Sequence, residues 1–207
     1  NPNALKTFKI VYSDNTLTDD DLFYFTYSLL NSKKYLDFYK TIIGREMPPI
    51  PFPSMDINVK DFCLIGKDLF NLHTNWNNSP EYQENELFER KVNIKSSYDL
   101  IQNIKLVKKT ENIELSAGRI IVISGIPLNV LDLKYNGTSP LEWVLKRSKP
   151  RSYKISGNLD NLSLFYKESG LDPNEEFVKY LRKIIYVSLE TLSLIKKLNN
   201  INLHLTN

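Results

Sequence analysis

The spacing of hydrophobic residues changes twice along the chain, and this change restricts the fold class more than any other feature. Leu22–Leu30 in the first third and Phe177–Ile195 in the last third are rich in apolar residues that follow the helical period. Between them, Arg119–Ser124 contains the β-branched run Ile120–Ile123 that is typical of a strand. The sequence therefore predicts an α+β fold with a helical N-terminal section, a small mostly antiparallel sheet in the middle and a long C-terminal helix.

Capping residues locate the starts of two helices. Thr18 followed by Asp19–Asp21 predicts a helix start, because a hydroxyl caps the first turn and negative charge is favoured there. Adjacent helical residues point in different directions, so this interpretation is preferred to a metal site formed by the three aspartates. Ser139 and Glu142, with Pro140 between them, predict a second start with a capping box.

Other segments are assigned by period and by helix breakers. The prolines of 47–53 predict an extended connector. Further helices are expected at about 33–43, 59–74 and 172–198, with a short one at 126–133. Two more strands are expected at 87–94 and 99–107, and residues 147–171 are expected to be irregular.

The composition fits a globular chain with one large domain or two small ones. Of the 207 residues, 42% are hydrophobic and 12% are aromatic, which argues against disorder of the whole chain. We divide the chain into a helical subregion 1–80, a β-rich subregion 81–135, and 136–207 with a basic loop and C-terminal helices. Because the first residue is Asn1 and not Met, we expect an excised fragment of a longer polypeptide.

Motifs for catalysis and cofactor binding are missing from the sequence. It contains no glycine-rich phosphate loop, dinucleotide fingerprint or nucleophile elbow. The single cysteine, Cys63, excludes an intrachain disulfide, fits a reducing cytoplasm and is expected to pack in the core. His73 is interpreted as a cation at a helix end, and not as a base or ligand. No run of about 18 apolar residues suggests a membrane span, and no signal peptide is present.

A basic segment follows the predicted Ser139 helix. Five of the nine residues 146–154 are basic, none is acidic, and residues 136–207 carry 11 basic against 7 acidic side chains. Such a segment can neutralise several phosphates, and an arginine can reach a guanine edge. A solvated basic loop, or a partner for the helix dipole, fits the spacing equally well. The expected DNA contacts are Lys146, Arg147, Lys149, Arg151, Tyr153 and Lys154, followed by Lys105, Lys108 and Lys109 near a predicted hairpin.

Several motifs in order resemble the C-terminal specificity region of type ISP restriction-modification enzymes. Tyr135–Val144 reads YNGTSPLEWV against the family's Y-x-V-N-G-x-S-P-L-E-W-V, and Val187–Thr191 reads VSLET against V-S-V-E-T. The remaining matches are Asp21–Tyr35, Met47–Pro51, Gly66–His73 and Ile126-Pro127. Asn31-Ser32-Lys33 replaces the family's His-Ser-Pro, and little beyond Ser156-Gly157 is kept after the SPLEW helix. The Trp of that helix, Trp143, is expected to pack.

The resemblance implies a target recognition domain from a large bacterial cytoplasmic enzyme. In that family a nuclease, a helicase-like DNA motor and an N6-adenine methyltransferase precede this region on one polypeptide. The fragment is then expected to bind double-stranded DNA, to read a short sequence and to have no catalytic residues. It would bind no cofactor itself, because S-adenosylmethionine, ATP and Mg²⁺ would be bound by the other domains.

Two alternatives remain at this point. A structural module could dock between the methyltransferase and motor domains without reading bases. A free-standing enzyme would need a cluster of acids, bases or ligands that the sequence does not contain.

Overall fold

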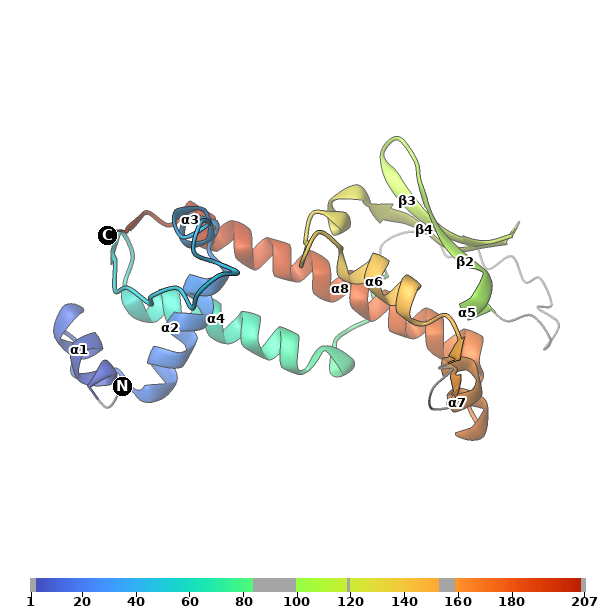
Figure 1. The fold of residues 1–207 in the computed structure, drawn as a ribbon, viewed down its shortest axis with the longest axis horizontal. Helices are drawn as coiled ribbons and strands as arrows, with labels where there is room; N and C mark the ends of the chain where they lie inside the picture. Colours follow the sequence, from blue (N-terminus) through green and yellow to red (C-terminus); the bar gives the residue numbers. More distant parts are fainter. Residues whose placement is uncertain (1–2, 84–99, 119, 153–158, 206–207) are drawn as a thin grey trace. The chain divides into compact units, whose positions relative to one another are not determined.

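The computed structural model describes residues 3–83, 100–118, 120–152 and 159–205, and it confirms the α+β class. The chain forms two compact units (Figure 1). Unit 1 comprises residues 1–75 and 190–207, and unit 2 comprises residues 76–189. Within the described ranges, no helix has both the length and the apolar character required to cross a membrane.

Unit 1 is built from helices around an aromatic core. Its elements are α1 (Ala4–Val11), α2 (Asp19–Asn31), α3 (Lys33–Phe38), α4 (Val59–Thr74), the two-stranded pair β1 (Ser54–Met55) and β7 (Leu203–His204), and the last turns of α8 (Pro173–Asn200). Phe8, Phe25 and Phe62 are fully buried in this core. Helices α2 and α4 approach closely at Gly66, where an added Cβ would lie 2.0 Å from the Tyr24 backbone oxygen.

Most of these helices lie where the sequence predicts them. Thr18 caps α2 with the predicted hydroxyl bond, and Asp21 completes a capping box that was not predicted. Residues 47–53 form no helix or strand, as expected from their prolines. The helix expected at 33–43 ends earlier, at Phe38, and continues as turns through the β-branched run Thr41–Ile43, in which side chains lose rotamer freedom when helical.

Unit 2 contains a three-stranded antiparallel sheet. The strands β2 (Ile104–Lys108), β3 (Asn112–Ala117) and β4 (Ile120–Pro127) are ordered β2-β3-β4. One face of β3 presents Ile113, Leu115 and Ala117 to the core, which also holds Phe177 and Leu181 of α8. The other elements are η1 (Trp76–Asn78), α5 (Leu100–Asn103), η2 (Leu128–Leu131), α6 (Pro140–Arg147), the pair β5 (Arg151–Ser152) and β6 (Leu159–Asp160), and α7 (Leu162–Glu168).

Several expectations for this unit need correction. The segment 99–107 is not one strand, because α5 occupies its first part and β2 its second. Strand β3 was not predicted, although its burial alternates with period two. Residues 147–171 include α7, which Asn161 caps by accepting a hydrogen bond from the Leu164 N–H at 3.2 Å. The strand expected at 87–94 lies outside the described residues.

Candidate nucleic-acid interface

Helix α6 divides its residues between the core and the solvent. Leu141, Val144 and Leu145 are buried in the core of unit 2. Trp143, Lys146 and Arg147 follow the three- and four-residue spacing of the opposite face, and all three are exposed. The solvent face of this helix therefore carries one aromatic ring and two cations.

The acidic residue of α6 is engaged at the start of the helix. The Ser139 hydroxyl and backbone N–H donate to Oε2 of Glu142 at 2.8 and 3.1 Å, and the Glu142 N–H donates back to the hydroxyl at 3.3 Å. The bonds that the Ser139 backbone N–H and hydroxyl donate to the carboxylate, with smaller contributions from Lys108 and Lys134, lower the pKa of Glu142. The carboxylate is thus held at the helix N-terminus and remains ionised at neutral pH.

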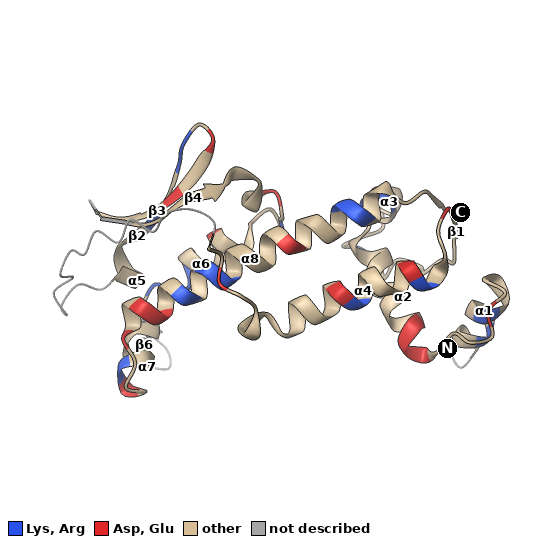
Figure 2. Cartoon of the chain, turned by 180° about the vertical axis from the view of Figure 1, so that it is seen from behind, with Lys and Arg blue, Asp and Glu red and all other residues tan. Residues whose placement is uncertain are grey.

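The cations that follow are not neutralised by described neighbours. Lys146, Arg147 and Lys149 are exposed, and none forms an ion pair with an acidic side chain in the part of the chain that the structure describes. Figure 2 marks the Lys and Arg residues of the described chain in blue and the Asp and Glu residues in red. We call Trp143, Lys146, Arg147 and Lys149 the α6 basic face. Unpaired surface cations of this kind are available to phosphates.

Arg151 has a structural partner. Its Nη2 donates to the Lys146 backbone oxygen at 3.0 Å, which satisfies one of the free carbonyls at the C-terminal end of α6. A cation there also complements the helix dipole. Of the other expected contacts in this segment, Tyr153 and Lys154 lie outside the described residues.

The three lysines of the β2–β3 hairpin differ in their position and in their ion pairing. Lys108 lies near α6, since it contributes to lowering the pKa of Glu142. Lys105 is exposed and, because side chains alternate along a strand, it points to the opposite face of the sheet from Lys108. Lys109 is paired with Glu114, with 3.2 Å between Nζ and Oε2. Of these three lysines, Lys108 is therefore the one placed with the α6 basic face.

Sequence reasoning missed two exposed groups, one on the α6 basic face and one that acts on Glu142 of the same helix. Trp143 was expected to pack, but its side chain is 52% exposed and the Arg147 guanidinium carbon lies 5.6 Å from the ring centroid. Lys134 is also exposed and acts electrostatically on Glu142. The signal was present in the helical period, which places Trp143 opposite Leu141 and Leu145.

The sequence profile of the Type ISP C-terminal specificity domain matches residues 1–179. The chain belongs to this family. The family expected from the motifs is thereby confirmed, over a match that includes the α6 basic face. No curated protein matches the chain.

Solved structures similar to this specificity domain have larger chains. A nuclease-deletion mutant of the Type ISP restriction-modification enzyme LlaGI, in complex with a DNA substrate mimic, matches with a TM-score of 0.70 and 27% identity over 92% of this chain and 14% of its own. The ATP-dependent Type ISP enzyme LlaBIII bound to DNA matches with a TM-score of 0.70 and 25% identity over 95% of this chain and 12% of its own. The DrdV–DNA complex has the same fold, with a TM-score of 0.72 and 21% identity over 95% of this chain and 19% of its own. The specificity domain thus spans 12–19% of the chains that it resembles.

The histidine and cysteine of unit 1 have structural roles in the specificity domain. His73 is not a capping cation: its Nδ1 lies 2.7 Å from the Tyr27 hydroxyl and its Nε2 lies 3.0 Å from Thr191 Oγ1. Burial lowers the pKa of His73, so the ring is neutral at pH 7 and can accept from one hydroxyl while donating to the other. Cys63 is buried as expected, and burial raises the pKa of its thiol to about 12.

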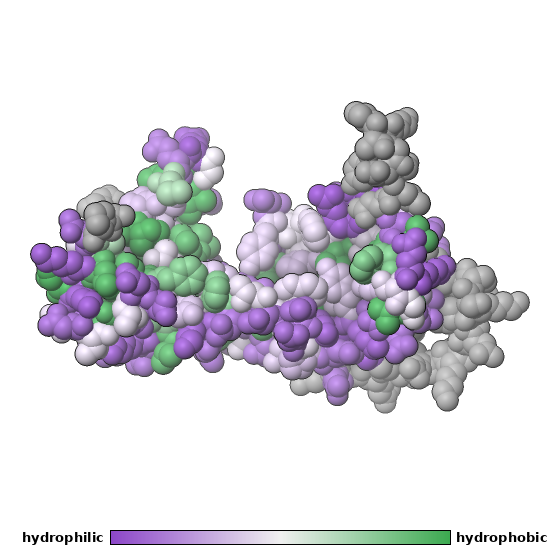
Figure 3. All heavy atoms as spheres, turned by 90° about the horizontal axis from the view of Figure 1, so that it is seen from below, coloured by the Kyte–Doolittle hydropathy of each residue, from purple (hydrophilic) through white to green (hydrophobic). Residues whose placement is uncertain are grey.

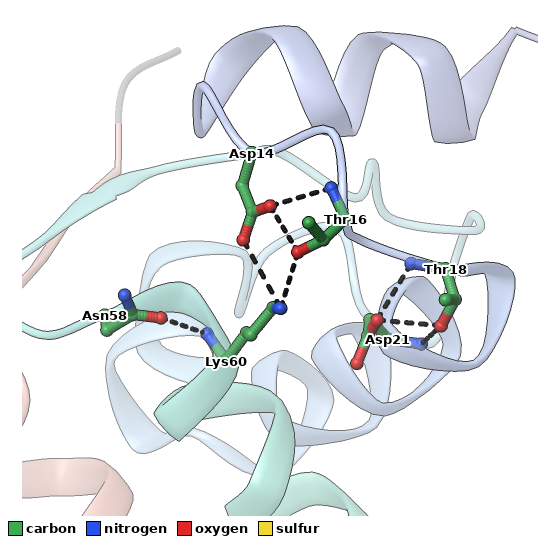
Figure 4. A network of polar contacts seen from close by, with 6 residues as sticks. All are labelled: Asp14, Thr16, Thr18, Asp21, Asn58 and Lys60. Carbon is green, nitrogen blue, oxygen red and sulfur yellow. Dashed lines mark hydrogen bonds and ion pairs between the residues drawn. The ribbon is translucent and has the colours of Figure 1, made fainter.

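A polar network around Asp14 and Lys60 fixes the start of α4 (Figure 4). Asp14 accepts from the Thr16 backbone N–H at 2.8 Å, and the Lys60 ammonium reaches the Thr16 hydroxyl at 2.6 Å. Asn58 caps α4 by accepting from the Lys60 N–H at 2.8 Å. Within the described ranges, no group of three His, Cys, Asp or Glu side chains is arranged to hold a metal ion. The contact between Lys60 and Thr16 connects the α1–α2 loop to α4.

Unit 1 also brings apolar side chains to its surface. Ile10, Val11, Phe23 and Leu64 are each more than two-fifths exposed. Figure 3 shows hydrophobic surface in green over this unit, on the left of the view. Contiguous apolar surface is a feature of faces that contact other proteins or domains.

Proposed function

We propose that this domain recognises a short sequence in duplex DNA on behalf of a Type ISP restriction-modification enzyme. The observation that carries the proposal is membership of the Type ISP specificity-domain family. Two relatives at 25–27% identity, LlaGI and LlaBIII, have been solved with a DNA mimic or DNA bound. The α6 basic face provides a surface of matching chemistry in this chain.

The basic residues would set the register of the domain on the duplex. Exposed Lys146, Arg147 and Lys149, with Lys108 nearby, can bind phosphates through charge and can displace condensed counterions. Phosphate contacts of this kind carry no sequence information themselves. Sequence would be read by side chains that enter a groove, where an arginine guanidinium, for example, can bind guanine through two hydrogen bonds.

The finer part of the proposal concerns the target adenine. The domain would hold the duplex so that a methyltransferase domain of the same polypeptide receives an adenine taken out of the base stack, and it would direct restriction to unmodified sites. S-adenosylmethionine, ATP and Mg²⁺ would be bound by the methyltransferase and helicase-like domains. The enzyme would act on foreign DNA in the bacterial cytoplasm.

Selection from a randomised duplex pool tests the proposal. The chain is incubated with the pool at two salt concentrations, and bound duplexes are recovered and sequenced. Enrichment of one short motif is the expected result, and the Lys146→Ala/Arg147→Ala/Lys149→Ala variant should lose it. Binding without enrichment of any motif would contradict sequence recognition by this domain.

A docking module is the second candidate function. It is favoured by the exposed apolar side chains of unit 1, which include Ile10 and Phe23. Such a module would hold the methyltransferase and motor domains together and would bind DNA weakly or not at all. The same selection discriminates the two, because a docking module enriches no motif and retains little or no duplex at either salt concentration.

A further inference from the structure

The exposed indole of Trp143 is the feature of unit 2 that phosphate binding does not explain. Trp143 is 52% exposed on the solvent face of α6, although a tryptophan side chain gains more from burial than almost any other. Arg147, one turn further along the helix, holds its guanidinium carbon 5.6 Å from the ring centroid. The helix therefore presents an aromatic ring with a cation over it.

Fold stability does not require this arrangement. The buried face of α6 is formed by Leu141, Val144 and Leu145, and the start of the helix is fixed by the Ser139–Glu142 capping box. A cation–π pair at an exposed site contributes only about 0.5–1 kcal/mol. A smaller polar residue at position 143 would leave the core and the cap unchanged.

The charges around Trp143 favour a nucleic-acid partner over a protein one. The other exposed positions of the α6 basic face are Lys146, Arg147 and Lys149, and Glu142 is the only acid on the helix. Glu142 is held by Ser139. An aromatic ring surrounded by unpaired cations is the combination that binds a polyanion and stacks on its bases.

We propose that Trp143 stacks on a nucleobase that has left the duplex stack, while Arg147 moves toward the adjacent phosphate. This inference rests on the proposed function. When a target adenine is flipped out of the duplex for methylation, base faces are uncovered that an intact duplex hides. Stacking tolerates any base, since every base has a π face. Trp143 would thus stabilise the opened duplex and leave sequence readout to other residues.

The two tryptophans of the chain make the test direct. Trp76, 37% exposed, contacts the Tyr180 ring with 5.3 Å between centroids, so Trp76→Phe keeps an aromatic ring there and leaves Trp143 as the only indole. Labelled random-sequence duplex at low salt, with and without one unpaired base, is titrated into this variant. Binding is read from the anisotropy of the label, and stacking is read from the emission of Trp143.

The expected result is quenching of Trp143 emission on binding, stronger with the duplex that contains an unpaired base. In the same background, Trp143→Ala should weaken binding to that duplex by about 5- to 100-fold. Trp143→Phe should restore most of the affinity because its ring can stack, whereas Trp143→Leu should behave like alanine. Trp76→Phe alone should bind as tightly as the unmodified chain.

Two outcomes would overturn the inference, and they differ in what they say of the proposed function. If the chain binds duplex while Trp143 emission and the affinity of Trp143→Ala stay unchanged, the stacking role is wrong and DNA recognition stands. If the unmodified chain binds neither duplex, both DNA recognition and the stacking role fail. Circular dichroism melts of each variant confirm that the helices remain folded.

Discussion

The Arg151 guanidinium donates a hydrogen bond to the backbone oxygen of Lys146 at 3.0 Å, while Lys149 between them has no described ion-pair partner. Arg151 and Lys149 are both basic, but it is Arg151 that donates a hydrogen bond to the end of α6. Arg151→Ala should reduce the free energy of unfolding by about 0.5–1 kcal/mol, because a carbonyl at the end of α6 loses its donor. Lys149→Ala should leave stability unchanged and weaken only DNA binding. Denaturant unfolding and duplex binding of both variants check this; equal stability of the two would contradict the capping role.

The reciprocal bonds between Ser139 and Glu142 predict a stability effect at the start of α6. Ser139→Ala removes a buried hydroxyl that both accepts and donates, and should cost about 1 kcal/mol. Glu142 has a lowered pKa in the folded state, so its contribution is present above the ordinary value of 4.5 and is lost as pH falls through the folded value. Ser139→Ala should therefore lose less stability between pH 6 and acidic pH than the unmodified chain, as measured by urea unfolding. An unchanged pH dependence would contradict this.

The buried His73 predicts a second effect of pH on stability. The folded chain favours the neutral form of His73, whereas it favours the charged form of Glu142. Because burial lowers its pKa below 6.5, the unfolded chain binds a proton more readily than the folded one. Stability should thus be unaffected by His73 above about pH 7.5 and should decrease as pH falls through 6.5 toward the folded pKa. His73→Gln, which can still bond to Tyr27 and Thr191 but does not titrate, should remove this part of the decrease. Urea unfolding of both proteins at pH 7.5 and 5.5 measures it, and an equal decrease in the two would contradict the assignment.

The close approach of α2 and α4 at Gly66 predicts that one added methyl group there destabilises unit 1. An added Cβ would lie 2.0 Å from the Tyr24 oxygen and 2.6 Å from Ser28 Oγ, so α2 and α4 would have to separate. Gly66→Ala should cost at least the ~1–3 kcal/mol typical of overpacking, despite the higher helix propensity of alanine. Asp68→Ala, on the exposed side of the same helix, is the matched control and should change stability little. Comparable melting temperatures for the two variants would contradict the close approach.

Elements with local signals could be predicted from sequence. Thr18 and Ser139 cap α2 and α6 through side chains within three residues of the helix start, so their effect is readable in a short window. Strand β3 was missed because its stability depends on pairing with β2 and β4 and on burial against α8, which no local window contains. Helix α1 has no side-chain cap bond and was likewise missed.

The charged residues of the candidate site could be predicted from the sequence. Their hydrogen-bond and ion-pair partners could not. The basic residues at 146–151 are visible in the sequence, but the bond from Arg151 to Lys146 depends on the turn that follows α6. The ion pair between Lys109 and Glu114 depends on the hairpin register. Trp143 was expected to pack, although the helical period places it opposite the buried Leu141 and Leu145, and its side chain is 52% exposed.

The most direct test of the account is the salt dependence of duplex binding for two triple variants with the same charge change. Lys146→Ala/Arg147→Ala/Lys149→Ala neutralises the α6 basic face, and Lys40→Ala/Lys196→Ala/Lys197→Ala neutralises three exposed lysines of unit 1. The slope of log affinity against log salt should become shallower by about 0.9 for each phosphate that the first variant no longer neutralises, and should stay unchanged in the second. Equal slopes for the two variants would show that the α6 basic face does not bind DNA.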